Sequence, residues 1–314
     1  MATKRGSKNV SLLDMRILAA VVTHNRCALL QRCLEHIEVQ TRKPDALLVV
    51  NNASTDDTVS MLSDRGTIFV SQENLGSAGG WNRCIQYALD EGFDAVWLMD
   101  DDGFPDANAL AALEQALSPG AACASSVVVK EDAPAEFVFP FPMLNAKGLP
   151  VLFGSFRKLH RIKDLEDFSP GGIYPFAHFF NGALIDVSAV RLVGNVESSF
   201  FMSGDEVDYF FRLRAVGKVF SVIEAKHMHP DVSKRPYTPA KVYYYLKNTL
   251  ILNNRYFDRP GIRHCLAVLA VLIRIAQRNG WIEMFFYIGG RHAPAFYAAI
   301  SRGLSGKLGR DFNV

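Results

Sequence analysis

The amino-acid sequence predicts an α/β fold in which a mostly parallel β-sheet is flanked by helices and followed by a C-terminal helical segment. Three observations support this prediction. Short apolar runs of strand length recur along the first 130 residues. Segments whose apolar residues recur at helical spacing separate these runs, and loops rich in polar residues or glycine follow most of the runs. Strands that alternate with helices in this way form parallel sheets with helices on both faces.

The first run, 17–22 (ILAAVV), has the uninterrupted apolar pattern of a strand buried on both faces. In the next segment Leu30, Leu34 and Ile37 recur at helical spacing, which predicts an amphipathic helix over 27–40. The alternation continues with predicted strands at 47–50, 67–70, 96–99 and 122–130, and with predicted helices after Thr55 as far as Leu62, at 79–91 and at 108–117.

The second half of the chain has a different character. Residues 131–175 are rich in Pro, Gly and Phe without a clear period, so we expect a long, partly ordered crossing segment. Strand-like composition returns at 176–185, and the later pattern predicts a helix at 204–216, a strand at 218–223 and a helix at 240–257. The last sixty or so residues have a helical pattern in which apolar and basic positions mix.

Composition narrows the class of protein. The 314 residues include 34 Lys and Arg against 32 Asp and Glu, and this balance gives no support for nucleic acid as a partner. The five cysteines are scattered without metal-ligand spacing, as is typical of a reducing compartment. Residues 1–14 carry basic side chains but no apolar run, so we expect a flexible N-terminus and no secretory signal. The apolar stretch 265–273 is too short to span a bilayer, and the expected location is cytoplasmic.

The strongest local feature is the segment 97–105, a predicted buried strand that runs into three aspartates. Consecutive carboxylates repel one another, and a divalent cation such as Mg²⁺ or Mn²⁺ removes that penalty. Asp100 and Asp102 could face one cation while Asp101 points away. The alternative is a solvated acidic turn before a helix, but ligands gather at the carboxyl ends of parallel strands, which favours a site.

A second acidic group opens the predicted helix at 204–216. Asp205, Glu206 and Asp208 lie near its N-terminus, where the helix dipole stabilises negative charge. A structural role in capping is therefore one interpretation. The functional interpretation is that one carboxylate removes a proton from an attacking hydroxyl as a general base. The periodicity does not choose among the three.

Two further segments are candidates for binding. His227 and His229 follow the predicted strand at 218–223; a structural role is the simpler interpretation, and an imidazole could also complete the coordination of Mn²⁺. The stretch 74–83 contains Gly76, Gly79 and Gly80, which allow close approach of the backbone to a ligand. It lacks the Gly-Lys-Ser/Thr ending of a Walker A loop.

Five of these segments, in this order, resemble family 2 glycosyltransferases with the GT-A fold, a Rossmann-like sheet flanked by helices. They are 22–26 (VTHNR), 50–56 (VNNASTD), 74–80 (NLGSAGG), 98–102 (LMDDD) and 204–208 (GDEVD), and the resemblance covers roughly residues 15–255. Within the family the chain looks most similar to the galactofuranosyltransferase and rhamnosyltransferase branch. Segments 97–105, 180–184 and 204–207 resemble galactofuranosyltransferases that begin galactan on a lipid-linked acceptor.

The resemblance implies roles for individual residues. Glu206 aligns with the catalytic carboxylate, although most relatives have Asp there, and Asp205 remains a candidate. Asn51 stands where many relatives carry an Asp. Asp100, Asp102 and His229 would hold Mn²⁺ or Mg²⁺. The implied nucleotide-sugar ligands are Thr23, Asn25, Arg26, Asn52, Asp56, Asn74, Gly76, Gly80 and Asp101.

The implied reaction is an inverting, metal-dependent transfer from a nucleotide sugar, with UDP-galactofuranose favoured, to a lipid-linked glycan or polysaccharide. Alternatives are transfer of rhamnose from dTDP-rhamnose, a nucleotidyltransferase, and a binding protein without catalysis. We expect a nucleotide-sugar half at 15–130 and an acceptor half at 131–257. The basic, apolar segment 258–314 is either a helical cap or a surface that contacts the inner membrane peripherally on its cytoplasmic face.

Overall fold

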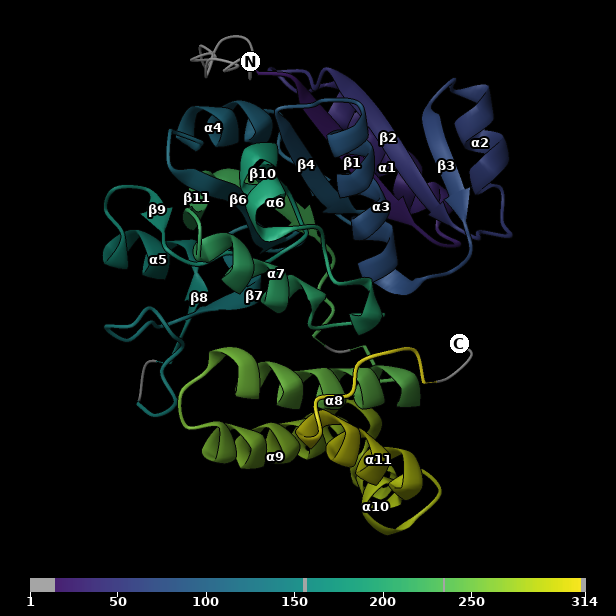
Figure 1. Ribbon diagram of the computed structural model, residues 1–314, viewed down its shortest axis with the longest axis vertical. Coiled ribbons are helices and arrows are strands. Elements are labelled where there is room, and N and C mark those ends of the chain that lie inside the picture. The colour runs from purple at the N-terminus through teal and green to yellow at the C-terminus, as the bar shows by residue number, and fades with distance from the viewer. Residues whose placement is uncertain (1–14, 155–156, 234, 312–314) are drawn as a thin grey trace, which may run out of the picture.

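The computed structural model describes residues 15–154, 157–233 and 235–311. It confirms the predicted α/β class: a central sheet with helices on both faces forms one part, and the C-terminal helices form a layer beside it (Figure 1). The expected flexible N-terminus, 1–14, lies outside the described residues.

The central sheet has the strand order β3-β2-β1-β4-β10-β6-β11-β5. The first four strands in this order are parallel, β10 is antiparallel to both β4 and β6, β11 is parallel to β6, and β5 is antiparallel to β11. The strands are β1 (Ile17–Thr23), β2 (Ala46–Asn52), β3 (Ile68–Gln72), β4 (Ala95–Asp100), β5 (Phe104–Pro105), β6 (Ala121–Lys130), β10 (Ala183–Asp186) and β11 (Lys218–His229).

Alternating side chains of the buried strands supply two cores, one on each face of the sheet. Leu18 and Ala20 of β1 lie in one core with residues of α3, α6 and α7. Ile17 and Ala19 lie in the other with residues of α1, α2 and α4. These helices are α1 (Cys27–Glu38), α2 (Thr58–Asp64), α3 (Gly76–Asp90), α4 (Ala109–Ala116), α6 (Val187–Val193) and α7 (Asp205–Arg214).

The crossing segment is more regular than its composition predicts. It contains β7 (Glu136–Pro142), β8 (Lys158–Arg161), α5 (Ile162–Phe168) and β9 (Ile173–Tyr174). These elements are too short to impose a hydrophobic period. Instead, Phe137, Phe141, Leu159 and Leu165 gather in a small core of their own, so burial comes from clustered aromatic and aliphatic residues.

Two strand predictions need correction. The strand expected at 176–185 is confined to β10, and the preceding residues form a loop that lines the cavity described below. The strand expected to end at 223 continues to His229, so both His227 and His229 lie in β11. An irregularity in the pairing of β11 with β6, between Val222 and Lys226, interrupts the alternation that sequence reasoning follows.

The helical layer consists of α8 (Pro239–Tyr256), α9 (Pro260–Asn279), α10 (Trp281–Gly289) and α11 (Ala293–Leu304), which confirms the predicted helical C-terminus. Tyr244 and Leu246 of α8 share a core with Val271 of α9 and Phe296 of α11. The domain boundary predicted at 257/258 therefore falls inside a packed unit, between α8 and α9. Asn248 of α8 donates hydrogen bonds to the carbonyls of Phe200, Met202 and Ser203, which fixes the loop that precedes α7.

Candidate active site

The carboxyl ends of β1, β2 and β4 meet at one edge of the sheet, as the parallel arrangement requires. Thr23 and Asn52 end β1 and β2, and Asp100 ends β4. The Oγ1 of Thr23 donates to Asp101 Oδ2 at 2.7 Å. The Nδ2 of Asn52 donates to the carbonyl of Gly76 at 3.1 Å, so the start of α3 is drawn to the same edge.

Other predicted nucleotide-sugar residues join the loops at this edge. The Oδ1 of Asn25 accepts a hydrogen bond from the Thr55 N–H at 2.7 Å, and Asp56 Oδ2 accepts from the Cys27 N–H at 3.0 Å. The Oδ1 of Asn74 accepts from the Gly76 N–H at 3.0 Å. The structure thus brings these predicted residues together, and their role toward a nucleotide stays a prediction.

Glycine serves the packing of the chain at two predicted positions. Gly76 has φ +73, and a Cβ there would clash with the backbone of Phe201. A Cβ at Gly80 would clash with the side chain of Val22. Both glycines therefore allow α3 to approach its neighbours closely, which accounts for them without a ligand.

The three consecutive aspartates have different partners. Arg26 forms ion pairs with Asp101 at 2.9 Å and with Asp102 at 3.1 Å. The Oδ1 of Asp102 also lies 3.0 Å from the Nε2 of His229, and its Oδ2 lies 3.5 Å from the Nη1 of Arg235. Asp100 forms no ion pair with a described residue and instead lines a cavity. Asp101 and Asp102 thus share Arg26, and the sharing of one cation by Asp100 and Asp102 stays a prediction.

The electrostatics of the three carboxylates differ accordingly. Burial and the charges of Asp102 and Asp101 raise the pKa of Asp100 to about 8. Burial also acts to raise the pKa of Asp102, but the hydrogen bond and charge of His229 and the charge of Arg26 outweigh it and lower that pKa below its usual range. Of the three carboxylates, Asp100 thus has the highest cost of ionisation, and a bound cation would lower that cost most.

The predicted metal ligands are only partly assembled. Asp102 and His229 are in contact, but within the described ranges no group of three or more His, Cys, Asp or Glu side chains is placed to hold an ion. Two carboxylates and one imidazole are nevertheless suitable donors for Mn²⁺, and carboxylates suit Mg²⁺. The chemistry of the donor set therefore fits a divalent cation.

At the start of α7, Asp205 and Glu206 line the same cavity as Asp100, a space of about 470 Å³ that Trp81 and Lys241 also line. Asp205 is 2% exposed, and its Oδ1 has no hydrogen-bond partner in the described chain. Burial, the charge of Glu206 and a hydrogen bond with Glu206 raise the pKa of Asp205 well above its usual value. The Oε2 of Glu206 accepts the Gly204 N–H at 2.6 Å.

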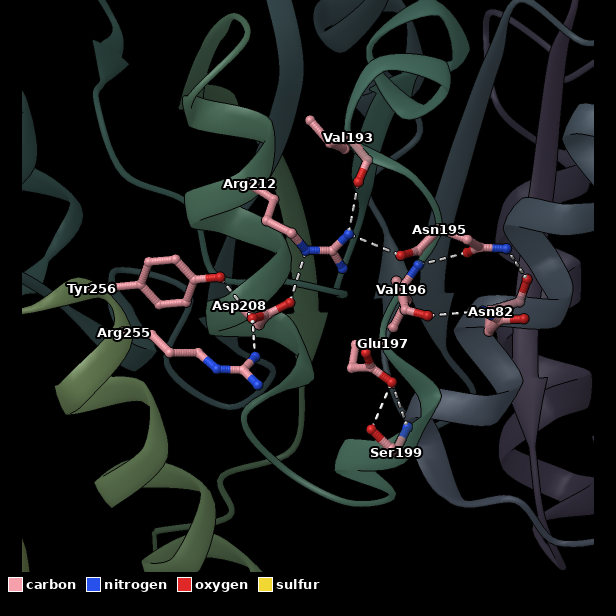
Figure 2. Close-up of polar contacts among 10 residues, drawn as sticks. All are labelled: Asn82, Val193, Asn195, Val196, Glu197, Ser199, Asp208, Arg212, Arg255 and Tyr256. Carbon is pink, nitrogen blue, oxygen red and sulfur yellow. Dashed lines mark hydrogen bonds and ion pairs between the residues drawn. The ribbon is translucent and has the colours of Figure 1, made fainter. Parts of the chain in front are cut away.

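Asp208, the third carboxylate of this group, is not among the residues that line the cavity. It lies in a polar network (Figure 2). It pairs with Arg212 at 2.8 Å and Arg255 at 3.0 Å and accepts a hydrogen bond from the Tyr256 hydroxyl at 2.7 Å. Arg212 also donates to the carbonyl of Asn195. Asp208 therefore ties α7 to α8 and to the loop after α6, and it is not placed to act as a base.

Sequence reasoning missed His178, whose segment shows only strand-like composition. His178 lines the cavity beside Glu206, and its Nε2 is buried without a hydrogen-bond partner among the described residues. Burial lowers the pKa of His178 to about 4, so the ring is neutral at pH 7. The other histidine singled out from sequence, His227, is fully buried, and burial lowers its pKa to about 3.

Comparisons with known proteins identify the class. The fold is that of glycosyltransferases with the GT-A fold. A model of Glycosyl transferase family 2 matches residues 19–181, and the chain belongs to this family. Galactofuranosyltransferase GlfT1 of Mycolicibacterium smegmatis is 34% identical over 222 residues, covering 68% of this chain and 70% of that protein. The Mycobacterium tuberculosis protein of the same name is 31% identical over 272 residues, covering 80% and 85%.

Solved structures of low sequence identity share the fold. The mannosyltransferase PcManGT of Pyrobaculum calidifontis, in complex with GDP-Man and Mn²⁺, has a TM-score of 0.54 and 18% identity, and the match covers 92% of this chain and 79% of that one. Residues 1–349 of S. aureus TarS have a TM-score of 0.52 and 11% identity, with coverage of 93% and 81%. These matches extend over the helical layer as well as the sheet.

Proposed function

We propose that this glycosyltransferase moves a sugar from a nucleotide-sugar donor to an acceptor hydroxyl in one displacement that inverts the anomeric centre. The observation that carries the proposal is that Asp100, Asp205 and Glu206 line one cavity without an ion-pair partner among the described residues. An inverting transfer needs only one carboxylate as base and one place where the leaving diphosphate is stabilised. Asp100 lies on β4, where a leaving diphosphate could be stabilised, and Asp205 and Glu206 lie on α7, where either could act as the base.

Glu206 is the better candidate for the base. Burial raises the pKa of both carboxyl groups; their mutual hydrogen bond raises the pKa of Asp205 further and opposes the rise at Glu206, which favours Asp205 as the holder of a shared proton. Glu206 is also stabilised as a carboxylate by the Gly204 N–H. Glu206 would accept the proton of the acceptor hydroxyl as this hydroxyl attacks, with protonated Asp205 holding its orientation. Asp205 remains the alternative base.

A divalent cation fits the other side of the cavity. Asp100 and Asp102, with His229, would hold Mn²⁺ or Mg²⁺, and the ion would supply positive charge beside the leaving nucleoside diphosphate. Support comes from the raised pKa of Asp100 and from the PcManGT structure, which is a complex with Mn²⁺. Thr23, Arg26 and Asn52 lie at the same edge, where they would contact the nucleotide.

The favoured donor is UDP-galactofuranose, and the favoured acceptor is a lipid-linked glycan. The support for the donor is the name of the relatives that are 31–34% identical. Incubation with a panel of sugar nucleotides and lipid-linked acceptors, read by mass spectrometry, tests the proposal. Transfer of a hexose from UDP-galactofuranose is the expected result. Transfer of a deoxyhexose alone would assign dTDP-rhamnose as donor, and no transfer from any donor would contradict the proposal.

The helical layer carries a surface suited to peripheral contact with an anionic bilayer. Trp281, Ile282 and Phe285 of α10 are 69%, 75% and 60% exposed. Basic side chains, Arg259, Arg263, Arg274, Arg278, Arg291 and Arg302, lie on the same group of helices or directly beside them. Exposed aromatic and aliphatic residues with arginines are typical of helices that lie in the membrane interface on its cytoplasmic face.

In the sequence the strongly apolar stretch is 265–273, but the helix α9 that contains it extends from Pro260 to Asn279. The helix has 20 residues, and an 18-residue window within it has a mean hydropathy of 1.3, so by length and composition α9 could cross a membrane; no other described helix could. Its residues Val271 and Ile275 are buried against the other helices of the layer. We therefore favour a peripheral contact through the exposed residues of the layer.

A further inference from the structure

The segment 305–311, which follows α11, leaves the helical layer and runs back toward the sheet part of the molecule (Figure 1). It forms neither helix nor strand. Leu308 packs against the core that contains residues of α3 and α7. The Gly309 N–H donates to the carbonyl of Ser199, just before α7, at 2.9 Å. The segment thus connects the helical layer to the two helices that begin at the candidate site.

A buried ion pair anchors this segment to α8. Lys247 of α8 is 0% exposed, and its Nζ donates to Asp311 Oδ2 at 2.6 Å and to the carbonyl of Gly309 at 2.8 Å. Asp311 also accepts a hydrogen bond from the Tyr243 hydroxyl at 3.0 Å and pairs with Arg302 of α11. Removing one partner of a buried ion pair is costly, so these contacts oppose movement of the segment away from α8.

Between these anchoring residues, Arg310 reaches the loop that precedes α3. Its Nη1 donates to the backbone carbonyl of Asn74 at 3.2 Å. Its guanidinium also lies 5.0 Å from the centre of the Phe201 ring, in the loop that precedes α7. A cation over an aromatic face is attracted to it, so one side chain holds both loops.

From Asn74 a chain of hydrogen bonds continues to the predicted nucleotide site. The Oδ1 of Asn74 accepts the Gly76 N–H, and the carbonyl of Gly76 accepts the Nδ2 of Asn52 at the end of β2. The Ala78 N–H donates to the carbonyl of Phe201 at 3.4 Å, which joins α3 to the second loop. A shift of Asn74 would therefore disturb the edge where a nucleotide would bind.

We propose that residues 305–311 form a strap that holds the Asn74 loop in place for the nucleotide of the donor. Arg310 is then a positioning residue: it acts through Asn74 and does not touch the donor. The proposal rests on the proposed function, because it takes the end of β2 and the start of α3 as the nucleotide site. It adds a contribution of the helical layer to donor binding.

Amide hydrogen exchange of the ligand-free protein tests the strap without a donor. We expect Arg310→Gln to speed exchange of Gly76 and Ala78 by roughly three- to tenfold, as loss of one hydrogen bond does, with 17–22 of β1 unchanged. Arg310 is exposed, so this replacement leaves the core intact. The matched control, Lys307→Gln, removes the same charge from another exposed position of the strap and should exchange as the wild type does.

Nucleotide binding tests the positioning role. Titration with UDP, dTDP and GDP in the presence of Mn²⁺ identifies the nucleotide that the wild type binds. Arg310→Gln should weaken that binding by roughly three- to tenfold without changing the midpoint of urea unfolding, because only the loop is released. Arg310→Lys keeps a cation that can lie over Phe201, so it should recover part of the affinity.

Unchanged exchange in Arg310→Gln, or an equal change in Lys307→Gln, would overturn the strap. Faster exchange of Gly76 and Ala78 with wild-type nucleotide affinity would overturn the positioning role of Arg310. A wild-type protein that binds none of the three nucleotides would contradict the proposed function and, with it, the donor role of Arg310. The exchange result would still decide whether the strap holds the loop, so the two failures are distinguishable.

Discussion

The two acidic groups of the chain, residues 100–102 and 205–208, each contain carboxylates of two kinds. Asp101, Asp102 and Asp208 are paired with arginines within 3.1 Å. Asp100, Asp205 and Glu206 form no such pair among the described residues, and these three line one cavity although they lie on β4 and α7. Paired carboxylates hold loops and helices together, whereas unpaired carboxylates that line a cavity can still bind a ligand or take up a proton. The comparison thus separates structural acids from candidate chemical ones.

The largest expected effect is on turnover at Glu206. Glu206→Gln keeps the shape of the side chain but removes the base, so we expect kcat to fall by roughly 10²- to 10⁴-fold with donor binding retained. Asp205→Asn, tested separately by the same kinetics and by titration with the nucleotide sugar, should cost less. A larger loss in Asp205→Asn would move the role of base to Asp205. If both variants keep near-normal turnover, neither is the base.

The next effect concerns the cation. Asp100→Asn removes the one unpaired carboxylate of the strand-end group. We expect the affinity for Mn²⁺ to fall by more than the roughly 10- to 100-fold that loss of an outer partner costs, because Asp100 would be a direct ligand. Titration of the purified protein with Mn²⁺, followed by electron paramagnetic resonance, measures this directly. Asp57→Asn is the control, because Asp57 is exposed near the same edge. Equal Mn²⁺ binding by Asp100→Asn and the wild type would remove Asp100 from the metal site.

Asp208 should behave as a structural acid. Asp208 is 2% exposed, and Asp208→Asn leaves Arg212 and Arg255 without their common carboxylate (Figure 2). Breaking a fully buried ion pair costs about 3–5 kcal/mol in free energy of unfolding. The loss here should be smaller because the side chains of Arg212 and Arg255 are 24% and 38% exposed, and urea denaturation measures it. The exposed Asp132 offers a control, since Asp132→Asn should change stability little. If the Asp208→Asn variant is as stable as the wild type but turns over as slowly as the Glu206→Gln variant, paired carboxylates are not purely structural and the distinction is wrong.

The smallest expected effect concerns the membrane surface of the helical layer. Ile282→Glu with Phe285→Glu should reduce flotation with vesicles that contain phosphatidylglycerol by about tenfold, because two apolar contacts are lost and two negative charges are added. Leu192→Glu, at a 73% exposed position on α6, is the matched control and should float as the wild type does. Point variants are preferable to removal of 258–314, since α8 shares its core with α9 and α11. Equal flotation of all three proteins would remove the membrane contact from α10.

The sequence predicts the sheet well because the signals of its strands are local. Apolar runs such as 17–22 and 96–99 are buried on both faces, so their position does not depend on distant contacts. The regular elements of 131–175 could not be predicted, because their burial depends on aromatic residues that meet only in the fold, such as Phe141 with Tyr174.

The contacts that the site residues make could not be predicted from the sequence either. The pairing of Arg26 with Asp101 joins residues 75 positions apart, and nothing in either segment indicates it. For the same reason the sequence could not separate Asp208 from Asp205 and Glu206: the distinction comes from Arg255 and Tyr256 on α8. His178 gave no signal at all, since its importance lies in a Nε2 atom left without a partner, among the described residues, after folding.

The anomeric configuration of the product tests the central claim most directly. The account requires one carboxylate, Glu206 or its neighbour Asp205, to activate the acceptor for attack opposite the leaving diphosphate. A product made from an α-linked nucleotide sugar and examined by NMR should therefore have the β configuration. A product that retains the α configuration would contradict the single displacement and the role given to the unpaired carboxylates.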